Sequence, residues 1–375
     1  MPTTRAPTVP FLDLGAIHAS LKQEILEEIA EIVDSGAFIN GPQVSAFEAA
    51  FAGYCGISAC AGLASGLDAL RLALQALEIG AGDQVIVPAN TFIASFEAIT
   101  QAGARPLPVD ASEEDYNLDP VALSAAVSEQ TRAVMPVHLY GQMADMKSIS
   151  AIAEANSLAV VEDACQAHGA SRAGIRPGAA GPAAFSFYPG KNLGAFGDAG
   201  ALVSSDEGLV ERVKMLREHG QRQKYRHEAI GYTARLDTIQ AAVLLRKLPQ
   251  LDGWNEARRA IAELYDDALL GVGDLRLPPV PEGSEPVWHL YVVRTGARDE
   301  LAGFLRERGI ATGLHYPEPP HLSSAYRALG YKRGDFPVAE RLADEVLSLP
   351  IFPGMTEGQS LRVVEQISEF FRVGV

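Results

Sequence analysis

One lysine of the sequence lies where an ammonium group is costly. Lys191 belongs to the segment Phe185–Asn192, among glycines, a proline and three aromatic residues. Apolar runs on both sides, Ala183–Phe187 and Ala199–Val203, predict buried strands. Burial of an ammonium costs on the order of several kcal/mol, whereas a lysine that condenses with an aldehyde avoids much of this cost. Taken alone, the segment favours a simpler interpretation, a loop lysine whose stem covers apolar surface.

A second reactive group is the carboxylate of Asp163, which follows an apolar strand in the segment Val160–Gly169. An unpaired carboxylate is costly there, so a cationic group should face it. A protonated pyridine nitrogen meets this need, because the carboxylate keeps the proton on the ring and the ring acts as an electron sink. A lone aspartate more commonly caps the next helix, and Gln166 and His168 could be ordinary turn residues. Together, Lys191 and Asp163 favour the chemical interpretation.

A phosphate site is indicated at the start of a helix. Ser65 is a suitable N-cap, Gly66 allows close approach to the backbone, and a helix is predicted over Leu67–Leu77. The first amides of a helix and its positive dipole end attract anions. Most helices with a serine cap bind nothing, so this signal is weak by itself.

The remaining pattern predicts an α/β fold with a largely parallel sheet, because short β-branched runs alternate with helices. Strands are expected at Gln84–Val87, Arg105–Val109, Ala133–His138, Ala159–Glu162, Ala183–Phe187 and Ala201–Ser204. Ligands of such sheets gather at the carboxyl ends of the strands. The candidate residues at those ends lie in Asn90–Phe92, His138–Tyr140, Asp163–His168 and Ser186–Lys191.

Length and composition limit the class of protein. The 375 residues suit two packed domains, expected at 1–250 and 251–375. The second is expected to be a smaller α/β domain, with a strand over Val287–Arg294 and a helix over Val338–Leu347. A formal charge of −16 argues against nucleic-acid binding. Three cysteines suit a reducing cytoplasm, and their spacing predicts no metal site. We find no signal peptide and no run long enough to span a bilayer, so a cytoplasmic protein is expected.

Positive charge is concentrated in one run that contains Arg222, Lys224, Arg226 and His227. On charge alone a solvated loop is as good an interpretation as a binding site. A phosphate-bearing substrate would favour the binding site.

Several motifs in the same order resemble the DegT/StrS-type sugar aminotransferases, which are pyridoxal 5′-phosphate enzymes of fold type I. The resemblance rests on Ser65–Leu70, Glu162–Gly169 and Phe185–Asn192, and it continues through Gly231–Asp237, Trp288–Tyr291 and His315–Pro317. It covers nearly the whole chain, and three separated motifs are far more specific than any one of them.

The resemblance implies a role for each matching residue. Lys191 would bond to the cofactor aldehyde, and Asp163 would pair with the pyridine nitrogen. The remaining cofactor contacts would be Gln166 near the ring hydroxyl, Phe92 stacked on the ring, and Ser186 with the amides of Gly66 and Leu67 at the phosphate. Thr233 stands where many relatives carry an asparagine that reaches the phosphate of the neighbouring subunit. A homodimer with its active site at the subunit interface is therefore expected.

The same resemblance implies transfer of an amino group from L-glutamate to a nucleotide-linked keto-sugar. The motifs are most similar to those of enzymes that act on dTDP-3-keto-6-deoxyhexoses. Alternatives are a 4-keto nucleotide sugar, a cyclitol, or a non-catalytic regulator of the same fold. Expected substrate contacts are Tyr188, Lys224, Tyr225, Arg226, His315 and Tyr316, and no metal or membrane partner is expected.

Overall fold

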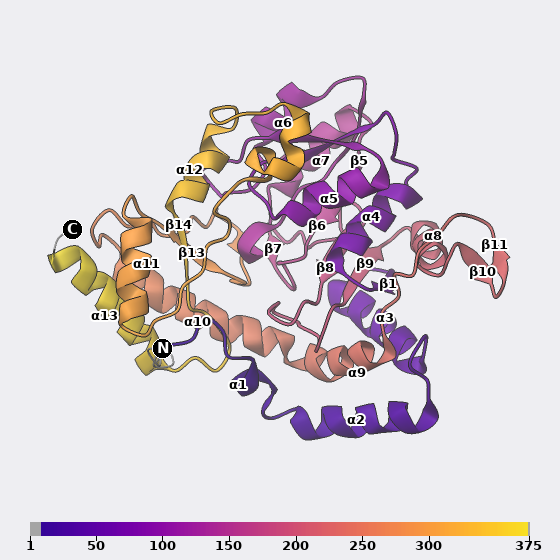
Figure 1. Cartoon of the computed structure of the whole chain (residues 1–375), viewed down its shortest axis with the longest axis horizontal. Helices are drawn as coiled ribbons and strands as arrows, with labels where there is room; N and C mark the ends of the chain where they lie inside the picture. The colour runs from indigo at the N-terminus through magenta and orange to yellow at the C-terminus, as the bar shows by residue number, and fades with distance from the viewer. Residues whose placement is uncertain (1–8, 374–375) are drawn as a thin grey trace.

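The computed structural model describes residues 9–373, and its centre is a β-sheet whose strands are connected largely by helices (Figure 1). Four strands run parallel in the order β3-β2-β4-β5, and four more follow in the order β1-β9-β8-β6. The two sets join, because β5 leads into β6 after one residue and Val137 pairs with Asp163. In the second set β9 runs antiparallel to both neighbours, while β6 and β8 are parallel. The predicted α/β fold with a largely parallel sheet is confirmed.

The strands of this sheet are short, and their side chains point alternately into two apolar cores. Their bounds are β1 Ala59–Leu63, β2 Gln84–Pro88, β3 Arg105–Val109, β4 Thr131–Val134, β5 Ala159–Val160, β6 Glu162–Asp163, β8 Ala183–Ser186 and β9 Gly200–Ser204. Successive side chains of a strand point to opposite faces. In β9, Ala201 and Val203 accordingly pack into one core and Leu202 into the other.

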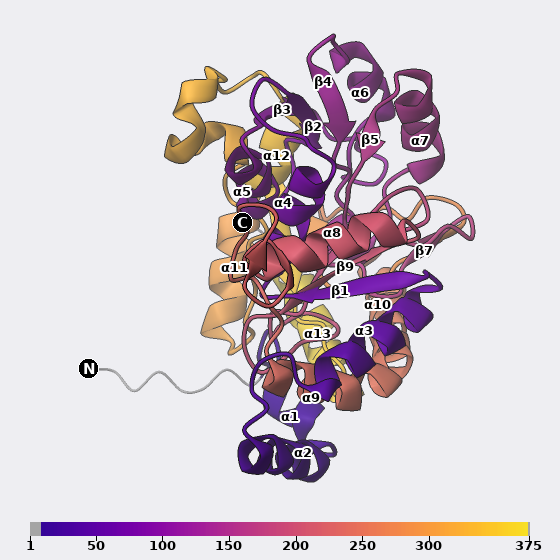
Figure 2. The same cartoon turned by 90° about the vertical axis from the view of Figure 1, so that its right-hand side faces the viewer.

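Helices cover both faces of the sheet. One core is closed by α4 (Gly66–Ala76), α5 (Ile93–Ala102) and α8 (Glu207–Arg217). The other is closed by α3 (Pro42–Cys55), α6 (Pro120–Ala126), α7 (Met146–Ala155) and α9 (Thr238–Lys247). Figure 2 shows α8 on one side of β1 and β9 and α3 on the other. Outside these layers lie α1 (Leu14–His18) and α2 (Lys22–Ser35), of which α2 packs on α9.

The C-terminal part has its own apolar core around β13 (Tyr291–Arg294), which pairs antiparallel with β14 (Val346–Leu349). Its helices are α10 (Leu251–Leu269), α11 (Arg298–Glu307), α12 (Pro337–Glu345) and α13 (Glu357–Val373). Val9 packs into the same core and pairs with Ile310. The division into 1–250 and 251–375 stays a prediction.

Several features differ from the expected elements. β1 and β14 were not predicted, and the helix expected over Val338–Leu347 ends at Glu345. The strand expected over Val287–Arg294 begins only at Tyr291. β14 is four residues long and entirely buried. A short, fully apolar run shows no hydrophobic periodicity by which a strand could be distinguished from a helix, so it could not be predicted. A short hairpin, β10 (Gln221–Gln223) with β11 (Arg226–His227), lies within the positive run. Across residues 9–373, no helix combines the length and apolar character needed to cross a bilayer.

A buried cation at the end of α9 makes stability depend on pH. Lys247 is 2% exposed, and its ammonium donates to the carbonyl of Gly194 and to Nε2 of His18 (3.1 Å). Burial lowers the pKa of Lys247 to about 8 from 10.5. The unfolded chain therefore binds more protons between these values, so the free energy of unfolding should rise with pH across that window, by at most about 3 kcal/mol.

Chemical denaturation between pH 7.5 and 10.5 tests this prediction. Other lysines and tyrosines titrate in the same range, so the comparison is with Lys247→Met. The difference in unfolding free energy between the wild type and this variant should become more favourable to the wild type as pH rises. Parallel curves for the two proteins would contradict the prediction.

Candidate functional site

The carboxylate of Asp163 is held in place by neighbouring donors at the end of β6. It is 6% exposed, and its Oδ2 accepts a hydrogen bond from the Ser95 hydroxyl (2.8 Å). Its Oδ1 accepts one from the Cys165 amide (3.2 Å). The hydroxyl of Thr91 in turn lies 2.8 Å from that of Ser95. These donors fix the orientation of the carboxylate and stabilise its negative charge.

Lys191 is placed by a tight turn that follows β8. Its backbone amide donates to the carbonyl of Tyr188 (2.8 Å), and a Cβ at Gly194 would lie 2.3 Å from the carbonyl oxygen of Pro189. Among the described residues, the amine of Lys191 has no hydrogen-bond or ion-pair partner. Burial lowers its pKa, while Cys165 and Asp163 act in the opposite direction. The amine is thus near Asp163, yet no ion pair joins them, and the amine is free for covalent chemistry.

The start of α4 forms a cradle of backbone amides. The Ser65 hydroxyl accepts a hydrogen bond from the Asp68 amide (3.0 Å), which leaves the amides of Gly66 and Leu67 without a partner in the part of the chain that the structure describes. A Cβ at Gly66 would lie 2.5 Å from the sulfur of Cys165 and 2.8 Å from Cβ of Ser186. Gly66, Leu67 and Ser186 therefore lie together, and this cradle fits a phosphate group.

Asp163, Lys191 and the start of α4 are called the cluster below. Aromatic and amide side chains lie beside it. Phe92 is 48% exposed, and the centre of its ring is 5.1 Å from that of Tyr316. The amide of Gln166 donates to the Tyr316 hydroxyl (3.2 Å) and accepts from the Tyr140 backbone amide (2.6 Å). Its remaining N–H has no partner in residues 9–373. Gln166 and Phe92 therefore have free surface beside these groups, and their contacts with a cofactor ring stay a prediction.

His315 belongs to the C-terminal part and is neutral. Its Nδ1 lies 2.8 Å from the Ser348 hydroxyl, and its carbonyl accepts from the Tyr140 hydroxyl (2.5 Å). Burial and the charge of Lys191 lower the pKa of His315 to about 4. The structure thus brings His315 and Tyr316 to the Lys191 side of the molecule. Tyr188, also expected to contact substrate, is 60% exposed.

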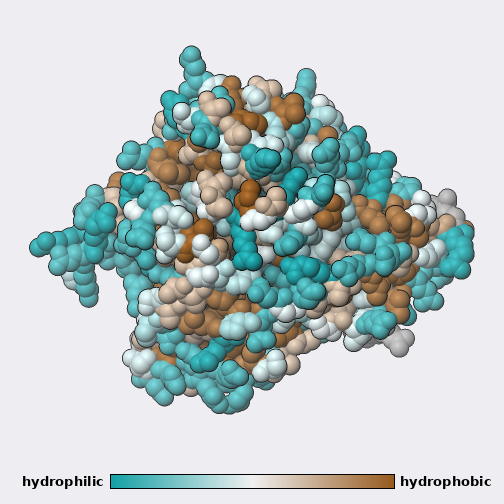
Figure 3. Space-filling model, turned by 180° about the vertical axis from the view of Figure 1, so that it is seen from behind, coloured by the Kyte–Doolittle hydropathy of each residue, from teal (hydrophilic) through white to brown (hydrophobic). Residues whose placement is uncertain are grey.

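The positive run lies apart from this cluster within one chain. The β10–β11 hairpin projects from the body, at the right of Figure 1 and at the left of the rear view in Figure 3, where the surface is mainly hydrophilic. Tyr225 is 80% exposed, and the Lys224 ammonium lies over its ring at 5.2 Å. Arg226 has no ion-pair partner within the described part of the chain. Thr233 pairs with Nε2 of His219 (3.1 Å) rather than with any Lys191-side residue.

Two histidines near strand ends, His138 and His168, are buried and contact only other protein groups among the described residues. His138 is fully buried; its Nδ1 accepts from the Ala144 amide (3.2 Å), so Nε2 carries the proton and donates to Glu162 (2.8 Å). The ring of His168 packs against Phe185 and Phe187. Burial, followed by the charge of Lys191, lowers the pKa of His168 to about 3, so this ring is neutral too.

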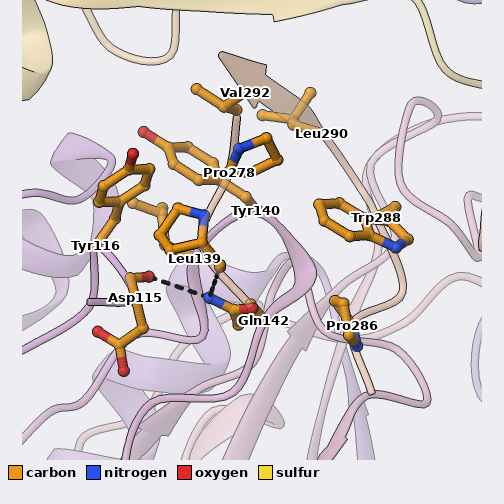
Figure 4. Close-up of a pocket in the computed structure, with 11 residues that line it drawn as sticks. Asp115, Tyr116, Leu139, Tyr140, Gln142, Pro278, Pro286, Trp288, Leu290 and Val292 are labelled. Atoms are coloured by element: carbon orange, nitrogen blue, oxygen red, sulfur yellow. Dashed lines mark hydrogen bonds between the residues drawn. The ribbon is translucent and has the colours of Figure 1, made fainter. Parts of the chain in front are cut away.

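A small cavity lies between residues 138–142 and β13 (Figure 4). Its volume is about 20 Å³, enough for roughly one water molecule. Tyr140, Trp288 and Leu290 line it, and the Gln142 amide donates to the carbonyls of Asp115 (3.3 Å) and Pro279 (3.0 Å). This volume excludes a sugar substrate, so the cavity is not the substrate site.

Sequence reasoning missed two residues of the cluster. Ser95 holds Asp163, and its only sequence signal is that it lies one helical turn after Thr91, in the segment after a strand. His289 contacts Asn192 (3.2 Å), and it stands in a motif of the resemblance to which no role was attached.

Removal of the Ser95 hydroxyl should weaken cofactor binding while the fold is retained. A hydrogen bond to a charged group contributes about 1.5–3 kcal/mol, and part of this is lost when the carboxylate of Asp163 can rotate. We expect Ser95→Ala to raise the dissociation constant for pyridoxal 5′-phosphate roughly tenfold in a fluorescence titration. Thr100→Ala, on the same helix, removes a hydroxyl that contacts Phe96 and Tyr326 instead and should leave the constant unchanged. Equal affinities in both variants would contradict this.

The fold defines a class of protein, the fold type I transferases. The sequence matches the DegT/DnrJ/EryC1/StrS aminotransferase family over residues 19–368, and the chain belongs to this family. The cofactor of this family is pyridoxal 5′-phosphate, as the sequence predicted, and the chain is an aminotransferase.

Individual relatives are similar to this chain over almost its whole length. A dTDP-3-amino-3,4,6-trideoxy-alpha-D-glucose transaminase of Streptomyces venezuelae is 50% identical over 365 residues, which are 97% of this chain and 96% of that protein. The crystal structure of DesV from S. venezuelae in complex with a ketimine intermediate has a TM-score of 0.96, with 49% identity over 98% of this chain and 99% of that one. NtdA from Bacillus subtilis, solved with bound cofactor PMP, has a TM-score of 0.90, with 29% identity over 99% of this chain and 87% of that one.

Proposed function

We propose that this aminotransferase transfers the amino group of L-glutamate to the keto carbon of a dTDP-3-keto-6-deoxyhexose. The observation that carries the substrate assignment is the 50% identity, over nearly the full length of both chains, to a transaminase whose name specifies a dTDP-3-amino sugar. The reaction fits the cluster, because an unpaired amine and an oriented carboxylate are both present at the carboxyl ends of β8 and β6.

Each residue would act on a defined atom. Lys191 would hold the cofactor through its amine, and after release the same amine would move the proton between substrate carbon and cofactor. Asp163 would keep the proton on the pyridine nitrogen, while Ser186 and the amides of Gly66 and Leu67 would bind the phosphate. The bound cofactor supplies the electron sink that stabilises negative charge at the substrate carbon. Gln166 and Phe92 would set the position of the ring.

Substrate contacts would come from two subunits. Tyr188, His315 and Tyr316 would contact the sugar from one subunit. The hairpin residues Lys224, Tyr225 and Arg226 would reach the diphosphate bound by the other subunit, and Thr233 would reach the phosphate of the neighbouring cofactor. The exposed ring of Tyr225 and the lack of an ion-pair partner for Arg226 within residues 9–373 support this assignment, because both side chains are available to a group outside the chain. We further propose a cytoplasmic homodimer, consistent with three free cysteines.

Product analysis tests the substrate. The purified protein is incubated with pyridoxal 5′-phosphate, L-glutamate and, in separate reactions, dTDP-3-keto-6-deoxyglucose, dTDP-4-keto-6-deoxyglucose, a UDP-linked 3-keto sugar and a keto-cyclitol. We expect a new amino sugar by mass spectrometry from the first compound at the highest kcat/KM. Preference for the 4-keto sugar or the cyclitol would reject the regiochemistry, and no amination of any compound would favour a regulator.

A further inference from the structure

The side chain that follows the reactive lysine is locked in one orientation. Asn192 is 4% exposed, and its amide nitrogen donates to Oδ1 of Asn255 and to the carbonyl of Val287, both at 2.8 Å. Asn255 in turn donates from its own amide nitrogen to the carbonyl of His168 (2.8 Å), so its oxygen must be the acceptor. Both donors of Asn192 are therefore used, and its oxygen is the atom that faces the next neighbour.

That neighbour is the imidazole of His289. Its Nδ1 lies 3.2 Å from Oδ1 of Asn192. Because this oxygen can only accept, Nδ1 of His289 must carry a proton and donate it. A neutral ring has one proton, so Nε2 of His289 is left as a bare acceptor.

The surroundings keep this ring neutral. Burial lowers the pKa of His289 well below its usual value, and the charges of Lys191 and Arg258 act in the same direction. The imidazoles of His315 and His168 also lie near this ring, and both are neutral. Arg258 is itself fixed, since its guanidinium donates to the carbonyls of Trp288 (3.1 Å) and Ile351 (2.7 Å).

Two groups without a partner therefore lie in the same part of the site. Within residues 9–373, Nε2 of His289 has no donor and the amine of Lys191 has no acceptor. The charge of Lys191 acts on His289, and Asn192, bonded to that ring, is the next residue in the chain. Asp163, the nearby carboxylate, already accepts from Ser95 and the Cys165 amide.

We infer that His289 is a positioning residue that accepts a hydrogen bond from the amine of Lys191 whenever that amine is free, and that Asn192 fixes the tautomer required. This inference rests on the proposed role of Lys191 as the reactive amine. The hydrogen bond would hold the amine in place between its release from the cofactor and its return. It would also favour the ammonium form, because an acceptor stabilises the charged donor.

Two substitutions of His289 test the roles of its two ring nitrogens separately. His289→Asn retains an amide near the position of Nδ1, able to donate to Asn192, and removes the acceptor at Nε2. His289→Gln places an amide near Nε2 and removes the donor to Asn192. Each protein is saturated with pyridoxamine 5′-phosphate, which has no aldehyde and leaves the lysine amine free. The pH dependence of Lys191 acetylation is then measured by peptide mass spectrometry, together with the melting temperature.

We expect His289→Asn to lower the midpoint of Lys191 acetylation by about one pH unit with little change in melting temperature. His289→Gln should keep the midpoint near that of the wild type and lower the melting temperature, because the buried oxygen of Asn192 loses its donor. An unchanged midpoint in His289→Asn, or equal shifts in both variants, would overturn the inference. Borohydride reduction of the wild type with pyridoxal 5′-phosphate tests the role of Lys191 independently, since it reports a covalent adduct and not the midpoint.

Discussion

Lys191→Ala is expected to abolish transamination while the fold is kept. The amine would supply both the covalent attachment and the proton transfer, and a positioned acid–base group alone contributes about 10²–10⁴-fold. We therefore expect the rate of amino-sugar formation to fall by at least about four orders of magnitude. The fold should tolerate the change, because the Lys191 amine makes no hydrogen bond or ion pair with any described residue.

The measurement is product formation at saturating glutamate and sugar, together with circular dichroism of the variant. Lys147→Ala is a matched control, because Lys147 is an exposed lysine on α7. Borohydride reduction should leave a pyridoxyl group on the peptide that contains Lys191 in the wild type and in the control, and not in Lys191→Ala. Transamination retained by Lys191→Ala, or an adduct found on a different lysine, would reject the assignment of the reactive amine.

Asp163→Asn should have the second largest effect. Asparagine has nearly the same shape but no charge, so it cannot keep a proton on the pyridine nitrogen, and the cofactor would become a weaker electron sink. An asparagine would also present an N–H towards either the Ser95 hydroxyl or the Cys165 amide, both of which donate to Asp163. We expect the turnover rate to fall by at least about a hundredfold.

Single-turnover kinetics of the glutamate half-reaction test this, because they isolate the chemical step from sugar binding. Asp252→Asn provides a control, since Asp252 is an exposed residue that accepts from the Tyr54 hydroxyl away from the cluster. Turnover of Asp163→Asn within a few fold of the wild type would show that this carboxylate does not face the pyridine nitrogen.

The three parts of the proposed cofactor site that were found in the sequence share one property. Lys191, Asp163 and the start of α4 each follow a short apolar strand and are marked by residues next to them in the chain. The strand period, the serine cap at Ser65 and the glycines around Lys191 are local signals, so the fold class and these positions could be predicted. Their roles stay predictions until the experiments above are done.

Contacts between distant segments could not be predicted in this way. Ser95 and Asp163 are 68 residues apart in the chain, and their hydrogen bond exists because α5 and β6 are brought together by the order of strands in the sheet. Local periodicity contains no information on that order. The β10–β11 hairpin was likewise hidden, because its short polar strands bury almost nothing and carry no apolar alternation.

The sequence by itself determined the family, the α/β fold and the residues most able to do chemistry, because each is encoded in a few adjacent positions. Only the tertiary structure decided how these residues are held. Asn192 and His289 are 97 residues apart, and Tyr140 and His315 are 175 apart. Side-chain hydrogen bonds of this kind depend on the packing of whole elements against one another, and that packing is a property of the assembled core rather than of any single segment.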